Sequence, residues 1–274
     1  MVDHEPSVLT APEIAAYHRD GYVVPRYRLP AAELARLQRL TEKILLDNPH
    51  LRDAPITCPH VPGSGVQGLK SSPEWLDVST APAILDMMEQ LLGPDLILWG
   101  SNLFYKRALE GPTTPWHRDG RHWVMRPLVT VSVWIAITDS MLDNGCLRFI
   151  PGSHASQELG EHYDAAEPGL IFPGTIRADE FDEADARDIE VEAGQMVLFD
   201  AYTIHGARAN RGTRPRGGYS LRFMPATSHF HHDAAVRRDT PGSAQHTRPL
   251  ILVRGMDRAG NDFRRGHPVQ PAQV

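Results

Sequence analysis

Two metal-ligand side chains separated by a single residue are the strongest chemical signal in the sequence. His117 and Asp119 lie in the segment Thr114–Gly120. Side chains alternate between faces along an extended segment, so residues i and i+2 point the same way and can reach one ion. A third candidate, His205, follows in Ala201–Gly206. Because the chain has 14 His and 34 acidic residues, the pair is meaningful only together with this second ligand source.

Two imidazoles and one carboxylate on one face of an octahedral ion leave three positions open, which is the arrangement of non-haem iron(II) oxygenases. Thiolates would favour zinc, and neither Cys58 nor Cys146 lies in the segments that carry these ligands. A 2-oxo acid can fill two of the open positions and O2 the third. The far carboxylate of that acid then needs a cation, and arginine suits because its planar fork pairs with a carboxylate through two hydrogen bonds.

Length and composition restrict the class of protein. A chain of 274 residues can bury its own hydrophobic core, and we expect a single domain. The net charge of −6 argues against nucleic-acid binding, because no basic surplus is available for phosphates. The sequence shows no secretory signal pattern and no apolar run near the ~20 residues that span a bilayer. We therefore expect a cytoplasmic protein without a membrane role that acts on a small molecule.

Helical signals come first in the chain, and strand signals follow after Pro94. Helices are predicted at Ala11–Asp20, at Pro30–Leu46 and at Pro82–Leu92, whereas residues 48–75 are predicted as loop. Short alternating or apolar runs predict strands at Tyr22–Val24, Leu96–Trp99, Leu103–Tyr105, Val129–Ile135, Cys146–Ile150, Ile189–Glu192, Met196–Phe199, Tyr219–Phe223 and Leu250–Val253. Many short strands separated by turns are typical of an antiparallel β barrel or jelly roll.

One long segment does not fit this pattern. Residues 156–188 show little periodicity, and the stretch from Ala178 to Glu192 holds eight acidic residues against one arginine. A solvated surface insertion and a mobile lid over a site are both open interpretations.

Five segments follow one another in a characteristic order: Asp20–Val24, Pro115–Gly120, Trp134–Asp139, Asp143–Leu147 running into Pro151–His154, and His205 followed eleven residues later by Arg216. In this order they resemble the phytanoyl-CoA dioxygenase family of iron(II)- and 2-oxoglutarate-dependent dioxygenases. The resemblance implies a mainly β fold with flanking helices around a double-stranded β-helix, which is a cupin-like jelly roll.

The order of the helical and strand signals, together with this fold, predicts how the chain is divided. One dioxygenase domain would span residues 1–274, with a mainly helical part at 1–94 packed on a jelly-roll core at 95–253. The core would carry a loop insertion at about 155–188, and residues 254–274 would form a tail.

The roles implied for individual residues are iron ligation by His117, Asp119 and His205, 2-oxoglutarate binding by Arg216, and further cofactor contacts from Trp134 and Lys106. For Trp134 a place in the core is an alternative, and for Lys106 a solvated position. Arg222 shares the strand parity of Arg216 and competes with it for the anion. The two glycines after Arg216 are expected to leave room for a ligand close to the backbone.

The activity implied is hydroxylation of a C–H bond in a small metabolite, with 2-oxoglutarate and O2 consumed and succinate and CO2 released. Asp119 disfavours a halogenase, because such enzymes have a small residue in place of the carboxylate. Two alternatives come from other classes: a catalytically silent binding module on the same fold, and a zinc hydrolase. Neither has a use for Arg216 together with all three ligands. Nothing in the sequence indicates an oligomeric state.

Cations gather around the H-x-D segment although the chain is acidic as a whole. They suggest an anionic substrate, and the candidate substrate residues are Arg121, Trp123 and Arg148. The alternative is that these arginines are solvated or pair with the acidic stretch from Ala178 to Glu192. A separate histidine cluster at His229–His232 lacks a matching carboxylate and is expected to be a surface loop.

Overall fold

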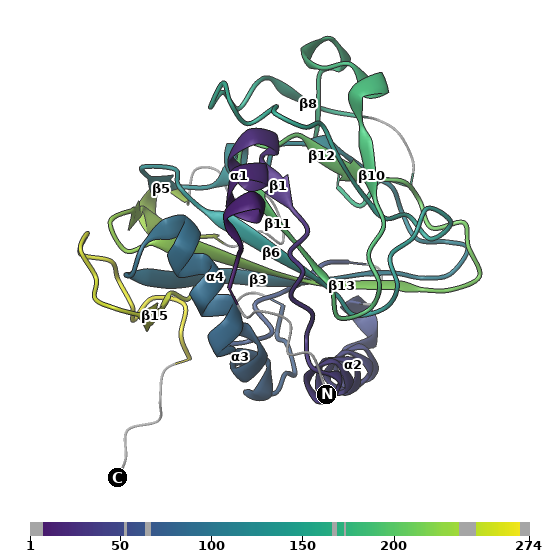
Figure 1. Cartoon of the computed structure of the whole chain (residues 1–274). Helices are drawn as coiled ribbons and strands as arrows, with labels where there is room; N and C mark the ends of the chain where they lie inside the picture. Colours follow the sequence, from purple (N-terminus) through teal and green to yellow (C-terminus); the bar gives the residue numbers. More distant parts are fainter. Residues whose placement is uncertain are drawn as a thin grey trace.

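Two antiparallel β-sheets form the centre of the computed structural model (Figure 1), which describes residues 8–51, 54–63, 67–165, 169–172, 174–235 and 245–268. The large sheet has the order β1 (Tyr22–Val23), β11 (Met196–Asp200), β6 (Val131–Ala136), β13 (Arg216–Pro225), β3 (Leu96–Lys106) and β15 (Ile251–Arg254), with β2 (Ile56–Thr57) paired to β3. The small sheet has the order β10 (Arg187–Ile189), β7 (Leu147–Phe149), β12 (His205–Ala207) and β4 (Thr114–His117). Two further pairs are β14 (His229–Phe230) with β5 (Met125–Arg126), and β8 (His162–Asp164) with β9 (Gly174–Ile176).

The helices lie mainly in the first third of the chain, as predicted. They are α1 (Ala11–Asp20), α2 (Ala31–Asp47), α3 (Glu74–Ser79), α4 (Pro82–Leu92) and a short α5 (His232–Ala235), with 3-10 turns at Pro49–Leu51, Asp119–His122, Ala178–Glu180, Glu183–Asp185 and Gln245–Thr247. A capping box of Thr10 and Glu13 starts α1, and Gly21 ends it in the left-handed region that favours glycine. The loop predicted at residues 48–75 was wrong at Ile56–Thr57, which form β2, and at its end, where α3 begins. This helix is too short for its period to be visible.

The outer face of the large sheet is covered by helices α2, α3 and α4 (Figure 1). Tyr219, Leu221 and Phe223 of β13 point into this layer, and Trp75 of α3 packs against the Tyr219 ring at 4.7 Å. Large apolar side chains buried in this way contribute about 1.5–3 kcal/mol each. Since strand side chains alternate, Arg216 and Arg222 lie on the opposite, inner face of β13.

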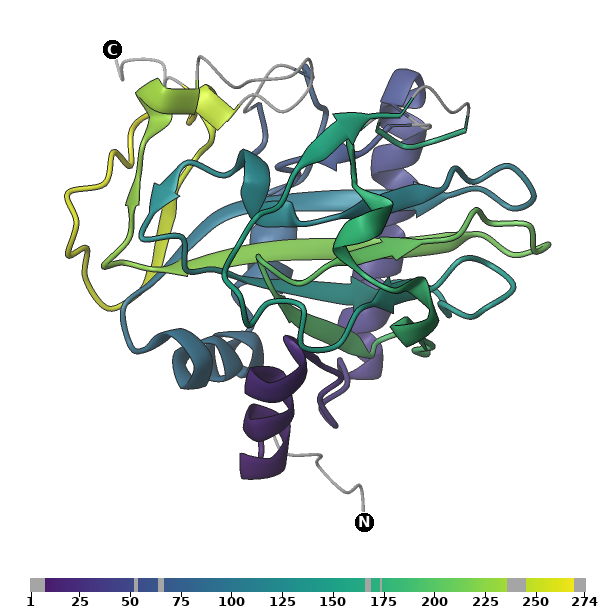
Figure 2. The same cartoon turned by 90° about the horizontal axis from the view of Figure 1, so that it is seen from above.

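The inner faces of the two sheets pack against each other. Trp134, Val197 and Phe199 of the large sheet form one apolar cluster with Leu147 and Phe149 of the small sheet. The resulting sandwich is the layered arrangement expected of a jelly roll. Figure 2 shows it from above, with α2 behind the long strands β3 and β13.

The structure adds two details to the predicted division. Besides its helices, the part before residue 94 contributes to the large sheet the predicted strand β1 and also β2, which was not predicted. The predicted insertion at about 155–188 contains the β8–β9 hairpin, which periodicity did not reveal. Residues 166–168 and 173 of this insertion, and residues 269–274 of the predicted tail, lie outside the described part of the chain.

Candidate metal centre and its neighbourhood

Strand pairing brings the three predicted ligands together. His205 of β12 lies directly opposite His117, the last residue of β4. Arg118 has an extended backbone, with φ −111° and ψ 124°, so Asp119 points to the same side as His117. One potential ligand atom from each of the three residues lies within 4.8 Å of the other two. The grouping expected from the sequence is therefore present in the fold.

Backbone carbonyls orient both imidazoles. His117 Nδ1 lies 2.9 Å from the carbonyl oxygen of Pro115, and His205 Nδ1 lies 3.0 Å from that of Thr203. A carbonyl only accepts hydrogen bonds, so each Nδ1 must carry the proton. Each Nε2 then keeps its lone pair for a metal, which is the way that ligating histidines are usually held.

Local electrostatics keep the group ready to bind a cation. Burial raises the pKa of the Asp119 carboxyl, but its positive surroundings, with Arg222 first among them, outweigh burial and lower that pKa. Burial and the nearby His117 lower the pKa of His205 to about 4. Phe149 and Phe199 pack against the His205 ring. At neutral pH the group offers a carboxylate and a neutral buried imidazole, and its nitrogen and oxygen donors fit iron(II).

Arg216 meets the requirements for an anion anchor. Its side chain is buried, and its Nε and Nη2 atoms have no hydrogen-bond partner. Within the described ranges no carboxylate lies within ion-pair distance of it. The guanidinium lies over the Trp134 ring, 4.5 Å from the ring centre, and burial lowers the pKa of Arg216 to about 10. A buried cation of this kind is costly unless an anion joins it, so these atoms fit the far carboxylate of 2-oxoglutarate.

Lys106 and Trp134 flank this guanidinium. Lys106 is the cross-strand partner of Arg216, and its Nζ donates to the carbonyls of Ala207 and Arg208, just after His205. Burial, followed by the charge of Arg216, lowers the pKa of Lys106 well below its usual value. The alternative of a solvated Lys106 was therefore wrong.

The expected free space at Gly218 is absent. A Cβ atom at position 218 would overlap the indole of Trp134, which lies directly across this glycine. Gly217 has Ile137 and Tyr105 against it. The absence of a side chain at 218 thus makes room for Trp134, which in turn supports Arg216.

Comparison with known proteins identifies the family. The family model described as phytanoyl-CoA dioxygenase matches residues 17–218, about three quarters of the chain. The chain belongs to the phytanoyl-CoA dioxygenase family. The predicted family and enzyme class, a non-haem iron(II)- and 2-oxoglutarate-dependent dioxygenase, are confirmed.

Relatives of this phytanoyl-CoA dioxygenase family member are distant but cover most of the chain. The peroxisomal phytanoyl-CoA dioxygenase of Homo sapiens is 28% identical over 242 residues, covering 82% of this chain and 71% of the relative. The ectoine dioxygenase of Sphingopyxis alaskensis is 24% identical, covering 96% and 88%. A solved structure described as CytC3 with Fe(II) and α-ketoglutarate superposes with a TM-score of 0.65 at 22% identity, covering 98% of this chain and all of that one. This likeness confirms the jelly-roll fold.

The predicted substrate residues of this family member have different surroundings. Arg148 pairs with Glu183 at 2.6 Å and Asp188 at 2.9 Å, so acidic residues of the stretch 178–192 neutralise it as the alternative interpretation expected. Trp123 is buried against Trp99 at 4.7 Å. Arg121 is partly buried, and the described residues include no ion-pair partner for it.

Arg222, which was not among the predicted substrate residues, lies next to the three candidate metal ligands. Its Nη2 is 3.9 Å from Asp119 Oδ2, and its Nη1 donates to Asn102 Oδ1. Burial lowers the pKa of Arg222, and Asp119 partly restores it. From sequence, Arg222 was only a competitor of Arg216. The sequence showed that Arg222 points to the same side of its strand as Arg216. It did not show that Asp119, from a distant segment, lies beside Arg222.

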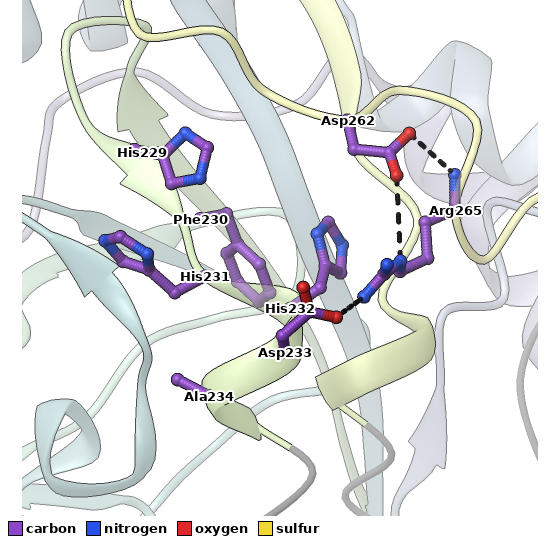
Figure 3. A pocket seen from close by; sticks show the side chains of 8 residues that line it. All are labelled: His229, Phe230, His231, His232, Asp233, Ala234, Asp262 and Arg265. Atoms are coloured by element: carbon purple, nitrogen blue, oxygen red, sulfur yellow. Dashed lines mark hydrogen bonds and ion pairs between the residues drawn. The ribbon is translucent and has the colours of Figure 1, made fainter.

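The histidine cluster His229–His232 lines a pocket that contains none of the three candidate metal ligands (Figure 3). His229 and Phe230 form β14, Phe230 and His232 are buried, and the expected surface loop was therefore wrong. Arg265 pairs with Asp233 at 2.5 Å and with Asp262 at 3.6 Å. Over the described ranges, His117, Asp119 and His205 are the only such group of three possible metal ligands. The same ranges contain no helix with the length and apolar character to cross a bilayer.

Proposed function

We propose that this chain hydroxylates a C–H bond of a small molecule, with 2-oxoglutarate and O2 converted to succinate and CO2. One oxygen atom of O2 would enter the product and the other the succinate. The observation that carries the proposal is the combination of the three-ligand group with the buried, partnerless guanidinium of Arg216. A zinc hydrolase would not require this second feature. Action on small molecules is also supported by the ectoine dioxygenase relative.

In the proposed site, iron(II) supplies the redox chemistry that couples decarboxylation of the 2-oxo acid to oxidation of the substrate. His117 and His205 would hold the metal through Nε2, and Asp119 through its carboxylate. Arg216 would bind the far carboxylate of 2-oxoglutarate, with its guanidinium held over the Trp134 ring. Lys106 would donate hydrogen bonds to the carbonyls of Ala207 and Arg208, and would thereby hold β12, which carries His205, in position.

Metal analysis after anaerobic purification, combined with succinate release, tests the proposal. We expect iron and 2-oxoglutarate-dependent succinate in the wild type, and no succinate from His117→Ala, Asp119→Ala or His205→Ala. Each variant should remain folded, because the hydrophobic core does not include the metal. His229→Ala is the matched control and should retain activity.

The alternatives give different results. A silent binding module would release no succinate, and a zinc hydrolase would retain zinc and consume no 2-oxoglutarate. Full activity of His205→Ala would overturn the ligand assignment. The cytoplasmic location stays a prediction from the sequence.

A further inference from the structure

Arg222 is a second buried arginine on the inner face of β13, six residues after Arg216. Only 8% of its surface is exposed. Asn102 accepts a hydrogen bond from its Nη1, and its Nε has no partner. The distance of 3.9 Å from Nη2 to Asp119 Oδ2 is too long for a hydrogen bond. Part of this guanidinium's donor capacity is therefore unused.

Two indoles, which contact each other, lie on one side of the same guanidinium. The Arg222 Cζ atom lies 5.7 Å from the ring centre of Trp99 and 5.3 Å from that of Trp123. Trp99 is itself fixed, because its Nε1 donates to Thr130 Oγ1 at 2.9 Å. This apolar wall excludes water from one side of the guanidinium, and an ion pair formed beside it is stronger than one at the surface.

The charges around Arg222 are unbalanced once a metal is bound. Asp119 is the only carboxylate near Arg222 in the described ranges, and the metal would use it as a ligand. Arg248 is also buried and lies close enough to disfavour the charge on Arg222. The carboxylates of 2-oxoglutarate are already assigned to Arg216 and the metal. A buried cation in this position requires another anion.

We propose that Arg222 binds a carboxylate of the substrate beside the paired indoles of Trp99 and Trp123. This inference rests on the proposed function and assigns its substrate class as a carboxylic acid. Because Arg222 lies next to Asp119, the bound carboxylate lies close to the metal. The C–H bond that is oxidised is therefore within a few bonds of that carboxylate. Arg148, in contrast, is already neutralised by Glu183 and Asp188.

A purely structural role for Arg222 makes a different prediction. If Arg222 only positioned Asp119, its replacement would change metal binding and would weaken an acid and its uncharged analogue alike. A substrate anchor instead discriminates between the two, because the amide of the same skeleton cannot form the ion pair. The ratio of acid to amide affinity is thus the decisive quantity.

The experiment uses the full chain loaded with nickel(II) and 2-oxoglutarate, which permits binding without turnover. The probes are phenylacetate, isovalerate, hexanoate and 2-hydroxybutyrate, each with its primary amide. Isothermal titration calorimetry gives the affinity of both members of each pair. The variants are Arg222→Gln and Arg222→Lys, with Arg121→Gln as the matched control, and circular dichroism checks their fold.

We expect at least one acid to bind the wild type about 10- to 100-fold more tightly than its amide, as for other charge-assisted pairs. Arg222→Gln should abolish this preference, Arg222→Lys should keep part of it, and Arg121→Gln should keep all of it. No preference in the wild type, a preference that survives Arg222→Gln, or one lost in Arg121→Gln overturns the inference. A wild type that releases succinate without acid preference fails only this inference, whereas one without succinate release fails the proposed function.

Discussion

The two ends of β13 present the same residue type on the same face of the same strand, yet in different surroundings. Arg216 has Lys106 beside it, Trp134 beneath it and no described carboxylate in reach. Arg222 has a carboxylate at 3.9 Å, and two indoles rather than one. The position of an arginine on the inner face of β13 determines that it is buried. The side chains of other elements determine which anion it can bind.

The largest effect is expected when each of the two arginines is replaced in turn. Arg216→Gln should raise the 2-oxoglutarate concentration needed for half-maximal succinate release about 100-fold, because a charge-assisted pair is lost. Arg222→Gln should change this value much less. Steady-state kinetics with varied 2-oxoglutarate, together with iron titration, measures both. The opposite ranking would show that the roles of the two ends are reversed.

A smaller effect is expected from the contact that distinguishes the Arg216 end. Gly218→Ala should destabilise the fold by about 1–3 kcal/mol, because the new methyl group overlaps the indole of Trp134 and must displace it. Affinity for 2-oxoglutarate should fall as well. Denaturant unfolding measures the first effect, and Gly174→Ala is the control because a Cβ there meets nothing within 4 Å. Equal stability of the two variants would contradict the packing assigned to Trp134.

Lys106 tests whether the Arg216 end depends on a second cation. Lys106→Met should cost about 1 kcal/mol, since the buried carbonyl of Ala207 and the partly buried carbonyl of Arg208 lose a donor while a costly buried charge is removed. We expect a smaller rise in the 2-oxoglutarate requirement than in Arg216→Gln. Thermal unfolding and the same kinetics provide the measurements. Lys43→Met, which removes only an exposed pair with Asp47, serves as the control.

A buried histidine of the outer layer, His60, which contacts the Ser101 hydroxyl of β3, has a small effect on stability near neutral pH. Burial, with the charges of Arg248 and His267, lowers the pKa of His60 to about 3. Between that value and about 6.5 the unfolded chain binds the proton and the folded chain does not. His60 therefore makes stability fall as the pH drops below about 6.5, by at most about 1.4 kcal/mol per pH unit. His60→Gln should have a flatter profile in unfolding experiments from pH 7 to 5, and an unchanged slope would contradict this assignment.

Local spacing predicted part of the site and of the fold. The positions of His117 and Asp119 followed from an extended segment, and α1 followed from its capping box, since both depend on neighbours in sequence. The pairing of His205 with His117 depends on strand register between distant segments, and only the family resemblance indicated it. Register also placed Arg222 beside Asp119.

Other features escaped sequence reasoning for different physical reasons. The β8–β9 hairpin has no apolar alternation, because its residues are mostly partly exposed rather than buried on one face. Gly218 does leave space beside the backbone, as predicted, but the indole of Trp134 fills that space and not a ligand. Arg148 is paired with acids about 40 residues away, which composition suggested only as an alternative.

Each candidate iron ligand of the imidazole type is fixed by the carbonyl two residues before it, Pro115 for His117 and Thr203 for His205. Main-chain acceptors persist whatever side chains surround them, so the oxidising centre should tolerate mutation of its neighbours. Arg222 is instead oriented by side chains, among them Asn102 and Trp99. Libraries that vary those positions should therefore be able to explore new substrates while the metal-binding half of the barrel stays intact.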